Sequence, residues 1–180
     1  MDDPLRDVVE AERSARKAVQ LGKDDAVPLA RASLVLAFVV HDLDAGWHFI
    51  DRALALNPNL ASAWYSSGWI RIWIGEPDLA VKHFAQFKRM SPFDPLLPLA
   101  QSGSAYAHFY AGRYGEALLQ VEQALQESPD LTPALRVSAA ANALVGRTEH
   151  AQDVMARLRG IDSTLRISNL KNLIPLHRPR

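Results

Sequence analysis

One spacing of about three dozen residues recurs along this chain of 180 residues, and it limits the possible folds more than any other feature. Pro58 and Pro92 are separated by this interval, and each closes a similar apolar phrase. The interior keeps the same register, with a slightly longer middle interval, in the series Gly46, Ala80, Ala117, Ala151 and in the series Ile50, Phe84, Val121, Met155. A fixed period of this length is typical of stacked supersecondary units.

Each unit is expected to contain two helices. Residues 61–74 are apolar on nearly every side, which is typical of a helix held between neighbours. Pro77 suits the first turn of the next helix, where its missing N–H would have no partner. We expect Gly68 and Ala80 to let the two helices approach closely, with Phe84 filling the space between them. The turns are marked by Gly75, Gly112 and Gly146, and we predict helices at 4–21, 27–40, 44–56, 61–74, 78–91, 96–111, 115–127, 132–145, 148–159 and 164–173.

The second unit resembles the tetratricopeptide (TPR) signature, W-x2-L-G-x2-Y…A-x3-F…P. Its spacings are matched by Trp64, Gly68, Ala80, Phe84 and Pro92. Ser67 and Arg71 replace the Leu and Tyr of the signature, so we expect one weaker helix contact there. The resemblance implies an all-α fold, a right-handed superhelix of about four TPR-like helix hairpins that carries an N-terminal half-repeat and a C-terminal capping helix.

The same register gives the expected organisation of the chain as a single TPR-like domain over residues 1–180. The expected parts are an N-terminal helix at 4–21, repeats at 24–58, 59–92, 93–129 and 130–163, and a capping helix and tail at 164–180. A connection with three prolines, residues 92–98, carries the longer interval. Because helix 4–21 looks like the second helix of a pair, we expect that the chain was cut from a longer protein at its beginning.

A narrower resemblance concerns three phrases at residues 49–60, 105–114 and 165–171. They are similar to the TPR region at the C-terminal end of bacterial class III adenylate cyclases, in which a catalytic domain precedes the repeats. Nothing in this sequence resembles that catalytic domain, with its alternating strands and helices and paired metal-binding aspartates. The resemblance implies a regulatory or docking segment of a signalling protein that makes no cyclic AMP itself.

Composition excludes several classes of protein. Twenty basic residues balance twenty acidic ones, which argues against a strongly basic nucleic-acid-binding protein. Without cysteine there is no disulfide framework and no thiolate site. The longest strongly apolar run, residues 34–40, is too short to cross a bilayer, and the acidic start is no signal peptide. We therefore expect a cytoplasmic protein that neither binds nucleic acid nor inserts into a membrane.

No pattern points to catalysis. No serine stands in a G-x-S-x-G turn, and residues 112–115 form a helix–helix turn without the Lys-Ser/Thr pair of a phosphate loop. Asp44 and His48 are the one pair worth testing as metal ligands, but zinc needs three or four ligands, and Asp44 more simply caps a helix. We expect no enzyme, no cofactor and no metal site.

A row of aromatic side chains is the strongest functional signal. Adding the repeat spacing to the first helix of each pair gives three rows: Arg31, Tyr65, Ser102, Arg136; Val35, Trp69, Tyr106, Ala140; and Phe38, Ile72, Phe109, Ala143, with Trp73 and Tyr110 one residue beyond. Aromatic and arginine side chains are the usual anchors of binding surfaces. We predict a concave groove with an arginine at each end, formed by Arg31, Val35, Tyr65, Trp69, Ile72, Ser102, Tyr106, Phe109 and Arg136.

The expected ligand is a protein or peptide partner, an extended or helical segment with apolar anchors and acidic flanks. The clamp that grips chaperone C-termini is not matched, because Arg31, Val35 and Ser66 stand where that clamp has Lys and Asn. Two alternatives stay open at this point. Either single rings of the row only fill space between helices, or the groove and the exposed ends bind a second copy of the chain in a homodimer.

Overall fold

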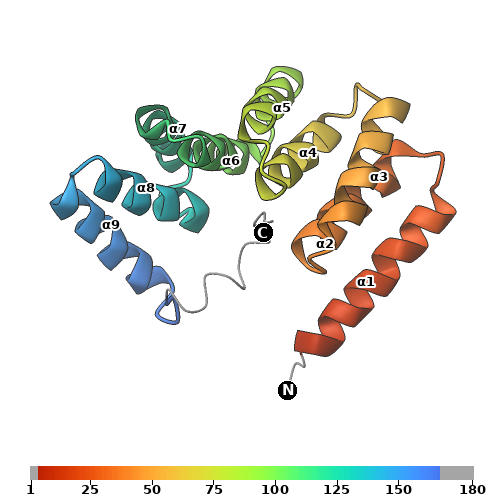
Figure 1. The fold of residues 1–180 in the computed structure, drawn as a ribbon, viewed down its shortest axis with the longest axis horizontal. Helices are drawn as coiled ribbons and strands as arrows, with labels where there is room; N and C mark the ends of the chain where they lie inside the picture. Colours follow the sequence, from red (N-terminus) through yellow and green to blue (C-terminus); the bar gives the residue numbers. More distant parts are fainter. Residues whose placement is uncertain (1–3, 167–180) are drawn as a thin grey trace.

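The computed structural model describes residues 4–166, and this part of the chain is helical throughout with no strand. Figure 1 shows the helices following one another along an arc, with α1 at one end and α8 and α9 at the other. The helices are α1 (Pro4–Leu21), α2 (Ala26–Phe38), α3 (Leu43–Leu56), α4 (Ala61–Trp73), α5 (Pro77–Met90), α6 (Leu97–Tyr110), α7 (Tyr114–Glu127), α8 (Thr132–Leu144) and α9 (Thr148–Ile161).

The packing follows the predicted period. Consecutive helices form antiparallel hairpins, and α2, α4, α6 and α8 also contact their counterparts in the next repeat. In Figure 1, α4 and α6 lie on the inner side of the arc, and α5 and α7 lie on its outer side. Among the described helices, α1 packs against α2 alone, as expected of a half-repeat. The predicted all-α superhelix of helix hairpins is confirmed.

The helix bounds agree with the predicted ranges to within two residues for the nine helices described. The predicted capping helix does not begin at residue 164, because residues 164–166 form a turn and an irregular segment. The remainder of that predicted helix, residues 167–173, lies outside the described residues.

Phe84 lies against the two inner helices α4 and α6. A Cβ atom added to Gly68 would lie 2.7 Å from the Phe84 ring, and one added to Gly103 would lie 2.4 Å from it. Phe84 itself is 2% exposed, and Ala80 beside it is fully buried. The predicted close approach at Gly68 is confirmed, and Gly103 of α6 repeats it on the other side of the same ring.

Left-handed residues end the first helix of each hairpin. Gly75, Gly112 and Gly146 have φ angles of 86°, 75° and 81°, which glycine adopts at little cost. The first hairpin has His41 at the corresponding position, one repeat interval before Gly75, with φ of 62°. His41 therefore adopts a conformation that is costly for a residue with a Cβ atom.

Ser67 and Arg71, which depart from the TPR signature, make hydrogen bonds inside the array. Arg71 is 7% exposed; its Nη1 donates to Glu76 Oε2 at 2.7 Å, and its Nη2 donates to Asp51. Ser67 Oγ lies 2.9 Å from Nδ1 of the buried His83. The weak contact expected at these positions is replaced by a polar network that joins α3, α4 and α5.

The connection with three prolines is longer than its equivalents in the other repeats. The α5–α6 connection spans residues 91–96, whereas the equivalent connections span residues 57–60 and 128–131, so the longer link lies where the prolines predicted it.

The prediction that Asp44 caps its helix is wrong. Asp42 is the N-cap of α3, with its Oδ1 accepting a hydrogen bond from Ala45 N at 3.0 Å.

Candidate binding groove

A cavity of about 250 Å³ opens on the inner side of the array, between α2, α4, α6 and α8. α4 contributes four side chains to it, and the other helices contribute two or three each. The lining residues are Leu34 and Phe38 from α2, Tyr65, Trp69, Ile72 and Trp73 from α4, Leu99, Tyr106 and Tyr110 from α6, and Pro133 and Arg136 from α8.

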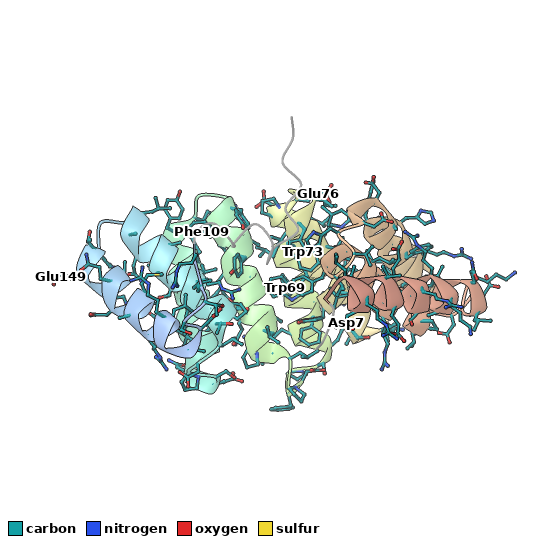
Figure 2. All side chains as sticks on the ribbon, turned by 90° about the horizontal axis from the view of Figure 1, so that it is seen from below. Asp7, Trp69, Trp73, Glu76, Phe109 and Glu149 are labelled. Carbon is teal, nitrogen blue, oxygen red and sulfur yellow. The ribbon has the colours of Figure 1, made fainter. Side chains whose placement is uncertain are left out.

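Five of these rings form a continuous chain across three helices. Phe38 stacks on Trp73 with ring centroids 5.5 Å apart, and Trp73 lies 6.0 Å from Trp69. Trp69 lies 6.0 Å from Tyr106, which lies 6.1 Å from Tyr110. Figure 2, which looks into the open side of the arc, shows Trp69 and Trp73 near the middle of the array. Each ring packs against the next, so the groove has a continuous aromatic lining.

Burial divides the groove into a floor and a rim. Ile72, Trp73 and Tyr106 are 3%, 5% and 8% exposed and form the floor. Phe38 and Tyr110 are 48% and 41% exposed and form the rim. Large exposed rings that border an apolar cavity are typical of contact surfaces, because they offer much apolar area at little cost in conformational entropy.

The groove carries little charge. Burial raises the pKa of Tyr106 to about 12, and burial also raises the pKa of Tyr65 and of Tyr110, so all three phenols are neutral at physiological pH. Arg136, at the α8 end, is the one charged residue among the described residues that line the cavity. The site therefore suits an apolar side chain, with a cation at one side of it.

Five of the nine predicted groove residues line this cavity: Tyr65, Trp69, Ile72, Tyr106 and Arg136. The other four do not. Arg31 is exposed outside the cavity, and Val35 packs beside Leu36 in a cluster shared with α1. Ser102 is fully buried and donates its hydroxyl to the Leu99 carbonyl at 2.8 Å. Phe109 packs on Tyr114, 5.6 Å away between ring centroids.

Arg31 is thus not part of the cavity, and among the described lining residues Arg136, at the α8 end, is the one cation. The nine predicted groove residues leave out six that line the cavity: Leu34, Phe38, Trp73, Leu99, Tyr110 and Pro133. Three of these stand in or beside the third predicted row. Leu99 and Pro133 lie one repeat interval apart, each one helical turn before Ser102 and Arg136, so the repeat register held a signal for them.

Within residues 4–166, no three His, Asp or Glu side chains gather closely enough to hold a metal ion. In the same part of the chain, no helix combines the length and the apolar character needed to cross a bilayer.

Comparison with known proteins shows which solved structures have a similar fold. No protein family model matches the sequence, and no curated protein matches it. The type IV pilus biogenesis factor PilW aligns with a TM-score of 0.77 and 18% identity, over 92% of this chain and 74% of PilW. YrrB, a TPR protein with an unusual peptide-binding site, aligns with a TM-score of 0.62 and 21% identity, over 83% of this chain and 75% of YrrB.

A third structure, residues 41 to the end of MamA from Desulfovibrio magneticus RS-1, aligns with a TM-score of 0.69 and 18% identity, over 87% of this chain and 86% of that one. At these identities the likeness establishes the fold. The chain has the architecture of TPR proteins.

Proposed function

We propose that this chain is a protein-interaction module that holds a segment of a protein partner in the aromatic groove. The chain of five rings across α2, α4 and α6 carries the proposal. A cavity of about 250 Å³ is smaller than the pockets of about 300–1,000 Å³ that enclose whole small ligands. It suits one or two apolar side chains of a longer segment.

The peptide-binding site named for YrrB supports this proposal by analogy of fold. The segment is extended or helical, and it places a large apolar side chain against Trp69. The module itself catalyses no reaction. Regulation of an attached cyclase domain and a cytoplasmic location are part of the proposal, supported by the sequence alone.

Self-association is a second candidate, favoured by two exposed apolar side chains on α1. Val9 and Leu21 are 65% and 79% exposed, and α1 packs against α2 alone among the described helices. Sedimentation velocity over a range of concentrations tests it. A sedimentation coefficient that rises with concentration in the wild type, and stays constant in Val9→Glu/Leu21→Glu, supports a homodimer. A constant value in the wild type contradicts it.

The groove proposal is tested with short random peptides displayed on phage and selected on the full chain. Calorimetry then compares the selected peptides on the wild type, on Trp69→Ala and on Leu119→Ala. Leu119 is a matched control, because it is a 58% exposed apolar residue on α7, outside the groove. We expect Trp69→Ala to weaken binding by about tenfold or more, and Leu119→Ala by about twofold or less.

Circular dichroism confirms that both variants remain helical before affinities are compared. Recovery of no binding peptide, or peptides that bind Trp69→Ala as tightly as the wild type, contradicts the proposal.

A further inference from the structure

The concave surface continues beyond the aromatic groove into a second cavity, of about 840 Å³, between α8 and α9. Arg136 lines both cavities, so the two are neighbours along the array. The second cavity is lined by small side chains, including Ala139, Ala140 and Ala143. An extended segment that leaves the aromatic groove at Arg136 has room to continue here.

The lining of the second cavity is positively charged. Arg136, Arg159 and Arg166 contribute side chains to it, and no Asp or Glu is among the described residues that line it. This contrasts with the chain as a whole, in which acidic and basic residues are equal in number. A cavity with cations on its walls and no anion attracts a carboxylate-bearing ligand and repels a basic one.

Arg136 lacks the carboxylate partners that Arg71, at the middle of the array, has. Arg71 is paired with both Asp51 and Glu76. Within residues 4–166, no carboxylate forms an ion pair with Arg136, whose charged side chain interacts with the Tyr106 hydroxyl instead. A guanidinium without a carboxylate partner can form charge-assisted hydrogen bonds with a carboxylate of a ligand.

Asp162 is a carboxylate whose pKa is affected by the charge of Arg136. Hydrogen bonds from Thr164 are the main cause that lowers the pKa of Asp162, and the charge of Arg136 adds to the effect. The Oδ1 atom of Asp162 accepts from Thr164 Oγ1 at 2.7 Å and from Thr164 N at 3.0 Å. The Asp162 carboxylate is therefore bound by Thr164 within the same turn, and it makes no ion pair with Arg136.

We propose that the segment bound by this module is acidic on one side of its apolar anchor, so that a ring or large aliphatic side chain fills the aromatic groove and carboxylates lie over Arg136 and Arg159. This inference rests on the proposed peptide-binding function. It also fixes a direction, with the anchor at α4 and α6 and the acidic residues at α8 and α9. Packed helices lie about 8–10 Å apart and an extended chain rises about 3.3 Å per residue, so the first acid lies about three residues from the anchor.

The experiment uses the peptides selected on the full chain, each made in two forms. One form is the selected sequence, and in the other every Asp and Glu is replaced by Asn and Gln. On the wild type we expect the acidic form to bind about tenfold more tightly than the amide form. On Arg136→Gln we expect this ratio to fall to about threefold, because one of the two cations that the carboxylates contact is gone.

Arg157→Gln is the matched control. Arg157 lies on α9, but it is paired with Asp130 at 2.9 Å and does not line the cavity, so the ratio is expected to stay at the wild-type value. Arg136→Lys keeps the charge and loses the planar fork, so we expect an intermediate ratio. Thermal melts confirm that each variant is folded.

The outcomes separate this inference from the one it rests on. Selected peptides that carry apolar anchors but no excess of acids, and that bind Arg136→Gln as well as the wild type, overturn the acidic specificity and leave the groove proposal intact. Recovery of no peptide at all overturns both. An unchanged ratio in Arg136→Gln overturns the assignment to Arg136, whatever the ratio in Arg157→Gln.

Discussion

The Trp69 ring lies 6.0 Å from the Tyr106 ring, centroid to centroid, across the contact between two successive inner helices. Trp69 also meets Phe84 edge-on at 5.7 Å. Phe84 in turn fills the space left by Gly68 and Gly103. The floor of the groove is therefore continuous with the packing that sets the spacing of α4 and α6, and a change at either glycine reaches the groove through Phe84.

Gly103→Ala is expected to destabilise the fold. The added Cβ would lie 2.4 Å from Phe84 Cζ, so the ring must move, and overpacking of this kind costs about 1–3 kcal/mol. Gly115→Ala on α7 is the control, because no atom lies within 4 Å of its added Cβ, and it should gain about 0.5–1 kcal/mol. Urea denaturation of both variants checks this. Equal stabilities would show that Phe84 does not require Gly103.

His41→Gly is expected to stabilise the fold by about 0.5 kcal/mol. His41 has φ of 62° at the position where the other hairpins have glycine, and glycine adopts this region without steric cost. The same substitution at His48, inside α3, should instead cost about 1 kcal/mol. Thermal melts of the two variants should therefore move in opposite directions from the wild type, and a lower melting temperature for His41→Gly would contradict this account.

His83 is expected to make the fold sensitive to acid. Burial, with a contribution from the charge of Arg71, lowers the pKa of His83 from 6.5 to about 4. Between pH 6.5 and 4 the unfolded chain binds a proton that the folded chain excludes, so stability is present above pH 6.5 and is lost as the pH falls toward 4. The loss reaches up to about 3 kcal/mol.

The measurement for His83 is the free energy of unfolding at several pH values, for the wild type and for His83→Gln. The variant should lose less stability between pH 6.5 and 4. Burial, together with the nearby Arg113, also lowers the pKa of His108, so His108→Gln serves as the comparison for a second histidine with the same sign. Identical pH profiles for the wild type and His83→Gln would contradict the assignment.

Asp42→Ala is expected to cost about 1–2 kcal/mol, because it removes the N-cap of α3. It also removes the ion pair between Asp42 Oδ2 and Arg16 Nη2, at 2.9 Å, which ties α1 to the start of α3. Asp44→Ala removes only a favourable charge in the first helical turn and should cost about 0.5 kcal/mol. Chemical denaturation distinguishes the two, and an equal or larger loss for Asp44→Ala would contradict Asp42 as the cap.

Much of the fold could be predicted because repeated positions carry repeated physical demands. Gly75, Gly112 and Gly146 recur because each hairpin needs a left-handed residue after its first helix. Small residues recur at Ala80 and Ala117 because two helices meet there, and both are fully buried. The period was therefore visible without any contact being known.

The groove was harder to predict because the register does not reveal what lies beside each helix. Val35 corresponds to Trp69, yet it packs in a cluster with Ala15 and Leu36, because α1 covers that side of α2. Leu34 corresponds to Gly68, yet it lines the cavity. Ser102 corresponds to Tyr65, but its hydroxyl turns back to the Leu99 carbonyl. These positions depend on neighbours that differ between repeats.

The central claim is that ligands bind at the aromatic groove, and the indole N–H signals of the four tryptophans test it most directly by NMR. Trp69 and Trp73 line the groove, whereas Trp64 donates to the Pro58 carbonyl at 2.8 Å and Trp47 lies against Arg71, away from it. On addition of a selected acidic peptide, the account predicts shifts of the Trp69 and Trp73 signals with those of Trp47 and Trp64 unchanged. Shifts of Trp47 or Trp64 while Trp69 and Trp73 stay in place would contradict it.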